Sequence, residues 1–124
     1  MQNDRAKFKN EFKGRVYKFA LDIVFLIDRL PKGQVSNVLS EQLLRSATSV
    51  GANVTEAQGA PSKKDYAHFF THALKSANET KFWLSLLIDS GKVDKESANK
   101  LLKETAEIAK ILAASIITMK GRGI

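Results

Sequence analysis

The side chains best suited to metal chemistry in this sequence are its two histidines, His68 and His72. They stand four residues apart, so a helix would place both imidazoles on one face, where such a pair can bind a transition metal. The residues between them are Phe69-Phe70-Thr71, however, so the glutamate general base of an HExxH motif is missing. We therefore expect no metal site and interpret the pair as part of a polar outer face, on which Lys75 and Glu79 form an ion pair.

Asn53 and Glu56 are the second candidates for chemistry, because they lie within a run of small residues that reads as a buried helix seam. A polar side chain that borders a core must find hydrogen-bond partners or cost stability. We expect a network between helices or subunits, with Arg45 or Arg29 as the partner; the alternative is a catalytic or ligand-binding Glu56. The sequence has no cysteine, and no Ser-His-Asp set, phosphate-binding glycine loop or paired carboxylates can be argued from it. We therefore predict no catalytic residue and no cofactor.

Basic side chains are the remaining chemistry. The chain carries 20 Lys and Arg against 13 Asp and Glu, a net charge of +7, and much of this excess lies in residues 1–18. Such a balance favours binding to nucleic acid, although a solvated surface is the alternative. The nucleic-acid contacts that we predict come from this segment and from the start of the third helix: Lys7, Lys9, Lys13, Arg15, Lys18, Lys63 and Lys64.

Four helices must position these side chains. In four segments, apolar or small residues recur at alternating spacings of four and three, which is the stripe of an amphipathic helix. No segment shows sustained alternation with a period of two. The sequence predicts an all-α, antiparallel up-and-down four-helix bundle in a single domain, 1–124, with a basic N-terminal segment at about 1–9 and a frayed tail at about 120–124. The helices are expected at about 8–30, 37–58, 63–90 and 95–119.

The ends of these helices carry recognisable signals. Ser36 or Ser40 could cap the second helix, Ser62 begins a capping-box-like start of the third, and Asp94 precedes the fourth. Gly59 and Gly91 are the expected stops of the second and third helices.

Gly51 stands inside the second helix, where it costs about 1 kcal/mol relative to alanine. Its neighbours Ser46, Ala47 and Ala52 are also small. We interpret this as a place where another helix approaches closely.

Two helices carry more apolar surface than one core-facing stripe requires. Leu84 and Leu87 point inward in the predicted third helix, so other large residues fall on its outer side. Large exposed apolar patches usually mark contacts, and we predict self-association or a stable partner interface. The interface residues that we predict are Phe25, Phe82, Trp83 and Leu86.

The chain shows no apolar signal-peptide core near its polar N-terminus, and its longest apolar run, Ile23–Ile27, is far too short to cross a bilayer. Together with the absence of cysteine, this leads us to expect a cytoplasmic protein without a membrane partner.

Two stretches carry a family resemblance: residues 45–58, RSATSVGANVTEAQ, and residues 74–87, LKSANETKFWLSLL. They resemble the bacterial four helix bundle protein family, which is similar to the proteins of 23S rRNA intervening sequences and to the accessory variability determinant of diversity-generating retroelements. The resemblance extends from about Phe12 to Met119. It implies an up-and-down bundle assembled as a homopentameric barrel. It also implies binding of nucleic acid through basic surface, and by analogy with the accessory determinant a reverse transcriptase as a partner. The intervening-sequence proteins have no established biochemical activity.

These observations predict a non-enzymatic, oligomeric helical-bundle protein that binds RNA or other nucleic acid through basic surface. The alternative is a protein-interaction adaptor or scaffold that uses the Phe82, Trp83 and Leu86 face and has no nucleic-acid role. A nuclease with a carboxylate or histidine metal site is the enzymatic alternative, and no acidic cluster supports it.

Overall fold

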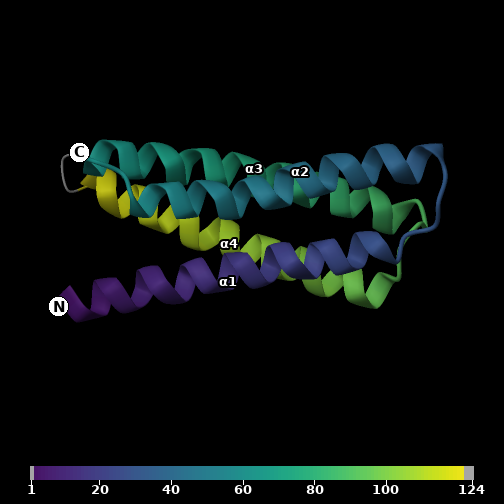
Figure 1. Ribbon diagram of the computed structural model, residues 1–124, viewed down its shortest axis with the longest axis horizontal. Coiled ribbons are helices and arrows are strands. Elements are labelled where there is room, and N and C mark those ends of the chain that lie inside the picture. The colour runs from purple at the N-terminus through teal and green to yellow at the C-terminus, as the bar shows by residue number, and fades with distance from the viewer. Residues whose placement is uncertain (1, 122–124) are drawn as a thin grey trace.

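The computed structural model describes residues 2–121, which form four long helices joined by short connections. These are α1 (Gln2–Asp28), α2 (Gln34–Gln58), α3 (Lys63–Asp89) and α4 (Lys95–Gly121). Figure 1 shows successive helices running in opposite directions, so that the two ends of the described chain lie at the same end of the molecule. Each helix packs against the next, and α4 closes the bundle against α1. The predicted all-α four-helix bundle is confirmed, and residues 2–121 contain no strand.

The start of α1 differs from the expectation. The helix begins at Gln2, six residues before the predicted start, so residues 2–9 are its first turns rather than a separate basic segment. Residues 4–11 are exposed, and good helix formers such as Ala6 and Lys7 support this part by propensity where burial is small. At the other end, α4 remains helical through Gly121. Met1 and residues 122–124 of the predicted tail lie outside the described residues.

Capping explains the other boundaries. The Ser62 hydroxyl accepts a hydrogen bond from the Asp65 N–H at 3.1 Å, and α3 ends just before Gly91, whose φ of +72° suits glycine. Asp94 accepts from the Ser97 N–H at 3.0 Å at the start of α4. The prediction for α2 was wrong, because its N-cap is Gly33, which offers no side-chain acceptor, and Ser36 is buried in the first turn.

The core runs along the predicted stripes and includes Phe19 and Ile23 of α1, Leu43 of α2, Leu84 of α3 and Leu112 of α4. Its most extensive helix pairing is between α2 and α3, where alanines let the two backbones approach. Near the end of α4 the buried stripe continues through Ile116.

Gly51 faces α1, yet close approach alone does not require glycine there. A Cβ built on Gly51 would lie 3.8 Å from the backbone oxygen of Val16, which is an ordinary van der Waals contact. Another helix, α1, therefore does approach Gly51 as expected, but at a distance that leaves room for a Cβ.

Some large apolar side chains remain on the outside of the bundle. Phe82 is 57% exposed, and Phe25 and Leu86 are also exposed. Trp83 is only half-buried and packs against the core from the flank of α3. Among residues 2–121, no helix is long and apolar enough to cross a membrane.

Candidate nucleic-acid interface

The predicted cations of α1 differ in what surrounds them. Lys18 donates a hydrogen bond to Asp22 at 2.7 Å, and this carboxylate raises the pKa of Lys18 above its usual value. The Lys7 ammonium lies 4.0 Å from the nearer carboxylate oxygen of Glu11. Lys13 is exposed and forms no salt bridge within residues 2–121. All three lysines lie on solvated surface, so a phosphate could reach each of them.

Arg15 lies in a different environment from the lysines of α1. Its Nε and Nη2 atoms donate to the two carboxylate oxygens of Glu104 on α4, at 2.8 Å and 2.7 Å. This two-bond contact, together with the charges of Glu104 and Glu107, raises the pKa of Arg15 above its usual value. The side chains of Arg15 and Glu104 are only 39% and 31% exposed. Arg15 therefore ties α1 to α4, and its charge is matched inside the molecule.

Lys9 and Lys63, which are far apart in the sequence, line the same pocket in the folded chain. The pocket has a volume of about 700 Å³ and lies where the first turns of α1, the α2–α3 connection and the last turns of α4 meet. Figure 1 shows the N-terminal end of α1 separating from α4 at this end of the bundle. Arg5 also lines the pocket, and Asp4 is its acidic lining residue among those described. Lys64 is exposed beside Lys63 but does not line the pocket.

An aromatic row forms one wall of the pocket. Phe8 stacks on Phe12 with the ring centroids 5.7 Å apart and the planes nearly parallel. The ring centroids of Phe12 and Phe70 are 6.0 Å apart, and those of Phe70 and Tyr66 are 4.7 Å apart. The two middle rings are buried, whereas Phe8 and Tyr66 at the two ends of the row line the pocket. Phe8 and Tyr66 thus present aromatic surface to the pocket, and the buried rings support them from behind.

Lys9 and Tyr66 hold the two sides of the pocket together. The Lys9 ammonium lies 5.2 Å from the centre of the Tyr66 ring, a cation–π arrangement. Gln58 donates a hydrogen bond to the Lys9 backbone oxygen at 2.9 Å and so joins α2 to α1. Burial raises the pKa of the Tyr66 hydroxyl above its ordinary value.

Arg5, Phe8 and Tyr66 line the pocket but were not among the predicted site residues, and the first helix was expected to begin only at about Phe8. The available signal was the spacing of Phe8 and Phe12, which continues the apolar stripe by one turn toward the N-terminus.

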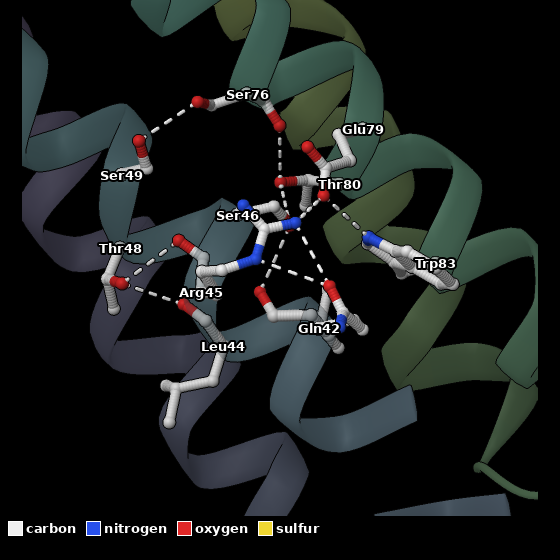
Figure 2. Close-up of polar contacts among 11 residues, drawn as sticks. Gln42, Leu44, Arg45, Ser46, Thr48, Ser49, Ser76, Glu79, Thr80 and Trp83 are labelled. Atoms are coloured by element: carbon white, nitrogen blue, oxygen red, sulfur yellow. Dashed lines mark hydrogen bonds and ion pairs between the residues drawn. The ribbon is translucent and has the colours of Figure 1, made fainter. Parts of the chain in front are cut away.

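The two stretches that carry the resemblance face each other as α2 and α3, and polar side chains connect them (Figure 2). Arg45 forms an ion pair with Glu79 and also donates to Gln42 at 3.0 Å. The Trp83 indole N–H donates to Glu79 at 3.1 Å. The expected Lys75–Glu79 ion pair was wrong, because Glu79 turns toward α2 and pairs with Arg45.

Deeper between α2 and α3, hydroxyl groups pair across the interface, as Figure 2 shows. The Thr80 hydroxyl donates to the Ser46 oxygen at 2.9 Å, and both residues are buried. Ser76 donates to Ser49 at 3.0 Å. Arg45 thus joins α2 to α3, but it does so through Glu79 and not through Asn53 or Glu56, the residues that were expected to bond with it.

Asn53 lies at the edge of this network, and Glu56 lies outside it. The Asn53 amide donates to the Ser49 hydroxyl at 3.1 Å, the same oxygen that accepts from Ser76, and to the Ser49 backbone oxygen at 2.9 Å. Glu56 is exposed on α2 and lines a groove between α1 and α2 together with Lys13. These positions give no support to a catalytic Glu56.

The histidine pair lies on the exposed side of α3, with the Nε2 atoms of His68 and His72 3.0 Å apart. Within residues 2–121, no group of three or more histidine, cysteine, aspartate or glutamate side chains is arranged to hold a metal ion.

Comparison with known families matches residues 9–114 to the family described as 23S rRNA-intervening sequence protein. The chain belongs to this family. The match includes both motif stretches and therefore the whole polar contact between α2 and α3. The first turns of α1, with Arg5 and Phe8, and the last turn of α4, with Met119, lie outside the matched residues.

A solved relative has the same architecture as this family member. It is a protein of unknown function from the S23 ribosomal protein family of Bacteroides thetaiotaomicron VPI-5482, 40% identical, with a TM-score of 0.80. The similarity covers 87% of this chain and 96% of that one. No protein with a curated description matches the chain.

Proposed function

We propose that this member of the 23S rRNA-intervening sequence protein family is a non-enzymatic protein that binds RNA or another nucleic acid through basic surface. The observation that carries the proposal is that Arg5, Lys9 and Lys63 line one pocket. This pocket lies where the first turns of α1 separate from α4, which we call the open end of the bundle. Two basic segments separated by 54 positions in the sequence thus supply charge to a single surface. A concentrated positive surface attracts phosphates and releases their counterions.

The test is a titration of labelled single-stranded RNA at several salt concentrations, monitored by filter binding or fluorescence anisotropy. A complex held by phosphate contacts weakens as salt rises, with a logarithmic slope of about 0.7 for each contacted phosphate of a single strand. The Lys9→Ala/Lys63→Ala variant should reduce this slope by about 1 to 1.5. No measurable binding of the wild type at low salt would overturn the proposal.

A matched control removes the same amount of charge elsewhere. Lys100 and Lys110 lie on α4, next to Glu96 and Glu107, and neither lines the pocket. The Lys100→Ala/Lys110→Ala variant should therefore leave the salt slope near the wild-type value. If both double variants reduce the slope equally, net charge rather than this surface drives binding, and the assignment of the contacts to the open end is wrong.

We also propose that the chain self-associates through its exposed apolar side chains, with five copies as the number that the family resemblance implies. Phe82 and Leu86 lie one turn apart on α3, and both are exposed. Burial of each such side chain contributes roughly 1.5–3 kcal/mol, so a symmetric assembly gains from every copy. Light scattering tests this, because a mass of 13.7 kDa at all concentrations would identify a monomer.

Phe82 is a sharper probe of this face than Trp83. Trp83 is half-buried and bonded to Glu79, so its replacement also disturbs the contact between α2 and α3. Phe82→Ala should lower the mass in solution without changing the thermal unfolding of the subunit. If Phe82→Ala leaves the mass unchanged, this face is not the assembly surface. It then remains available to a protein partner, as the adaptor alternative requires.

A further inference from the structure

We infer that the pocket at the open end of the bundle holds a single unpaired nucleobase, with its flanking phosphate bound by the basic rim. This inference rests on the proposed function and specifies which form of nucleic acid is bound. The volume of the pocket, about 700 Å³, falls within the range of small-molecule sites. A phosphate-binding surface alone needs only exposed cations, so the apolar cavity beside the cations requires a separate explanation.

The aromatic row provides the surface on which a base would stack. One face of the Phe8 ring is covered by Phe12, yet Phe8 remains 42% exposed and lines the pocket. The Tyr66 ring is already covered by the Lys9 ammonium. Phe8 is therefore the aromatic surface that remains available, and its contact with Phe12 fixes its orientation before a ligand arrives. A preorganised ring loses little entropy when a base stacks on it.

The charges around the cavity complement a nucleotide. Lys9, Lys63 and Arg5 line the cavity together with one acidic residue, Asp4. An apolar, aromatic interior beside cations is the combination that binds single-stranded nucleic acid, in which bases stack on aromatic rings and phosphates meet basic side chains. Paired bases in a duplex remain stacked on each other and cannot enter a concave site.

The experiment compares three labelled ligands by fluorescence anisotropy at fixed salt: a short single-stranded RNA, an abasic strand of the same length, and an RNA duplex. We expect the base-bearing strand to bind more tightly than the abasic strand. Phe8→Ala should weaken binding of the base-bearing strand by roughly 5- to 100-fold, which is the effect of losing one base–aromatic stack. Binding of the abasic strand and of the duplex should stay within about two-fold of the wild type.

Two further variants separate occupation of the pocket from damage to the fold. Ala114→Leu narrows the cavity from the α4 side without changing any charge or aromatic ring, and it should weaken the base-bearing strand selectively. Tyr17→Ala removes another aromatic ring from the same helix, 70% exposed and outside this pocket, and should have no effect. Circular dichroism checks that each variant keeps its helices.

The outcomes distinguish this inference from the proposal on which it rests. If the base-bearing and abasic strands bind the wild type equally, the pocket does not take a base, while the electrostatic proposal survives. If no strand binds at low salt, both are overturned. If uridine or adenosine monophosphate binds with the affinity of the strand and loses it in Phe8→Ala, the pocket is supported and assigned to free nucleotides. If Tyr17→Ala weakens binding as much as Phe8→Ala, the inference is wrong.

Discussion

Arg15 should act on stability rather than on nucleic-acid binding, although its sequence context places it among the candidate contacts. In the folded chain it spans α1 and α4, the least extensive of the four helix pairings, with two hydrogen bonds to Glu104. Arg15→Ala removes both bonds at once. We therefore expect α1 to be held less firmly along this seam.

The size of the effect follows from the exposure of the pair. Exposed ion pairs contribute at most about 1 kcal/mol, whereas two parallel bonds between charged groups are stronger than a single contact. Because the side chains of Arg15 and Glu104 are 39% and 31% exposed, solvent screens part of this gain. We expect Arg15→Ala to lower the free energy of unfolding by about 1–1.5 kcal/mol, which corresponds to roughly 3–7 °C in melting temperature for a chain of this size.

Urea unfolding, monitored by helical circular dichroism, measures this change, and the cycle with Glu104→Ala isolates the pair. The double variant should lose less stability than the sum of the single variants, with a coupling of about 1 kcal/mol. Glu104→Ala also frees the Arg15 guanidinium and removes one negative charge, so it should strengthen RNA binding slightly while it weakens the fold. Our reasoning is refuted if Arg15→Ala leaves unfolding unchanged and weakens RNA binding as much as Lys9→Ala does.

Three further predictions test the packing between helices and the capping of α4. Gly51→Ala should stabilise the fold by up to about 1 kcal/mol in urea unfolding, because the added Cβ makes only an ordinary contact with the α1 backbone; a loss of stability would contradict this. Thr80→Val should cost about 1 kcal/mol in the same assay, and adding Ser46→Ala should cost less than it does alone, because the bond between the two hydroxyls is already lost. The Ser97 N–H and hydroxyl hold the pKa of Asp94 below its ordinary value of 3.8, so the stability that this carboxylate contributes is present above that value and is lost as pH falls through the folded-state pKa. Asp94→Asn keeps a capping side chain but does not titrate, so its free energy of unfolding should fall less than that of the wild type between about pH 5 and pH 2, and an equal fall would contradict this assignment.

The helical periodicity of the sequence was sufficient to predict the bundle. Alternating spacings of four and three leave one apolar stripe on each helix, and four such helices with short connections can bury their stripes only against each other. The capping signals at Ser62 and Asp94 were equally local, because a side-chain oxygen reaches an N–H three residues away regardless of the rest of the fold.

The helix boundaries that were missed depend on weaker local preferences. Residues 4–7 form helix although they are exposed, so no apolar stripe marks them. The residue at the N-cap of α2 is Gly33, which has no side chain to accept a hydrogen bond, so no capping residue in the sequence marks the start of this helix.

The sequence by itself determined the helices, their order, the basic excess and the family. Only the tertiary structure decided which charges are used within the molecule and which face outward. Arg15 and Lys9 are both basic residues of one helix. Arg15 is paired with Glu104, however, whereas Lys9 lines a pocket together with Lys63. Glu79 likewise forms its ion pair with Arg45 of α2 and not with Lys75 of its own helix. The physical reason is that an ion pair or a pocket depends on distances between helices, and these distances are set by packing of the whole core, which no local sequence pattern encodes.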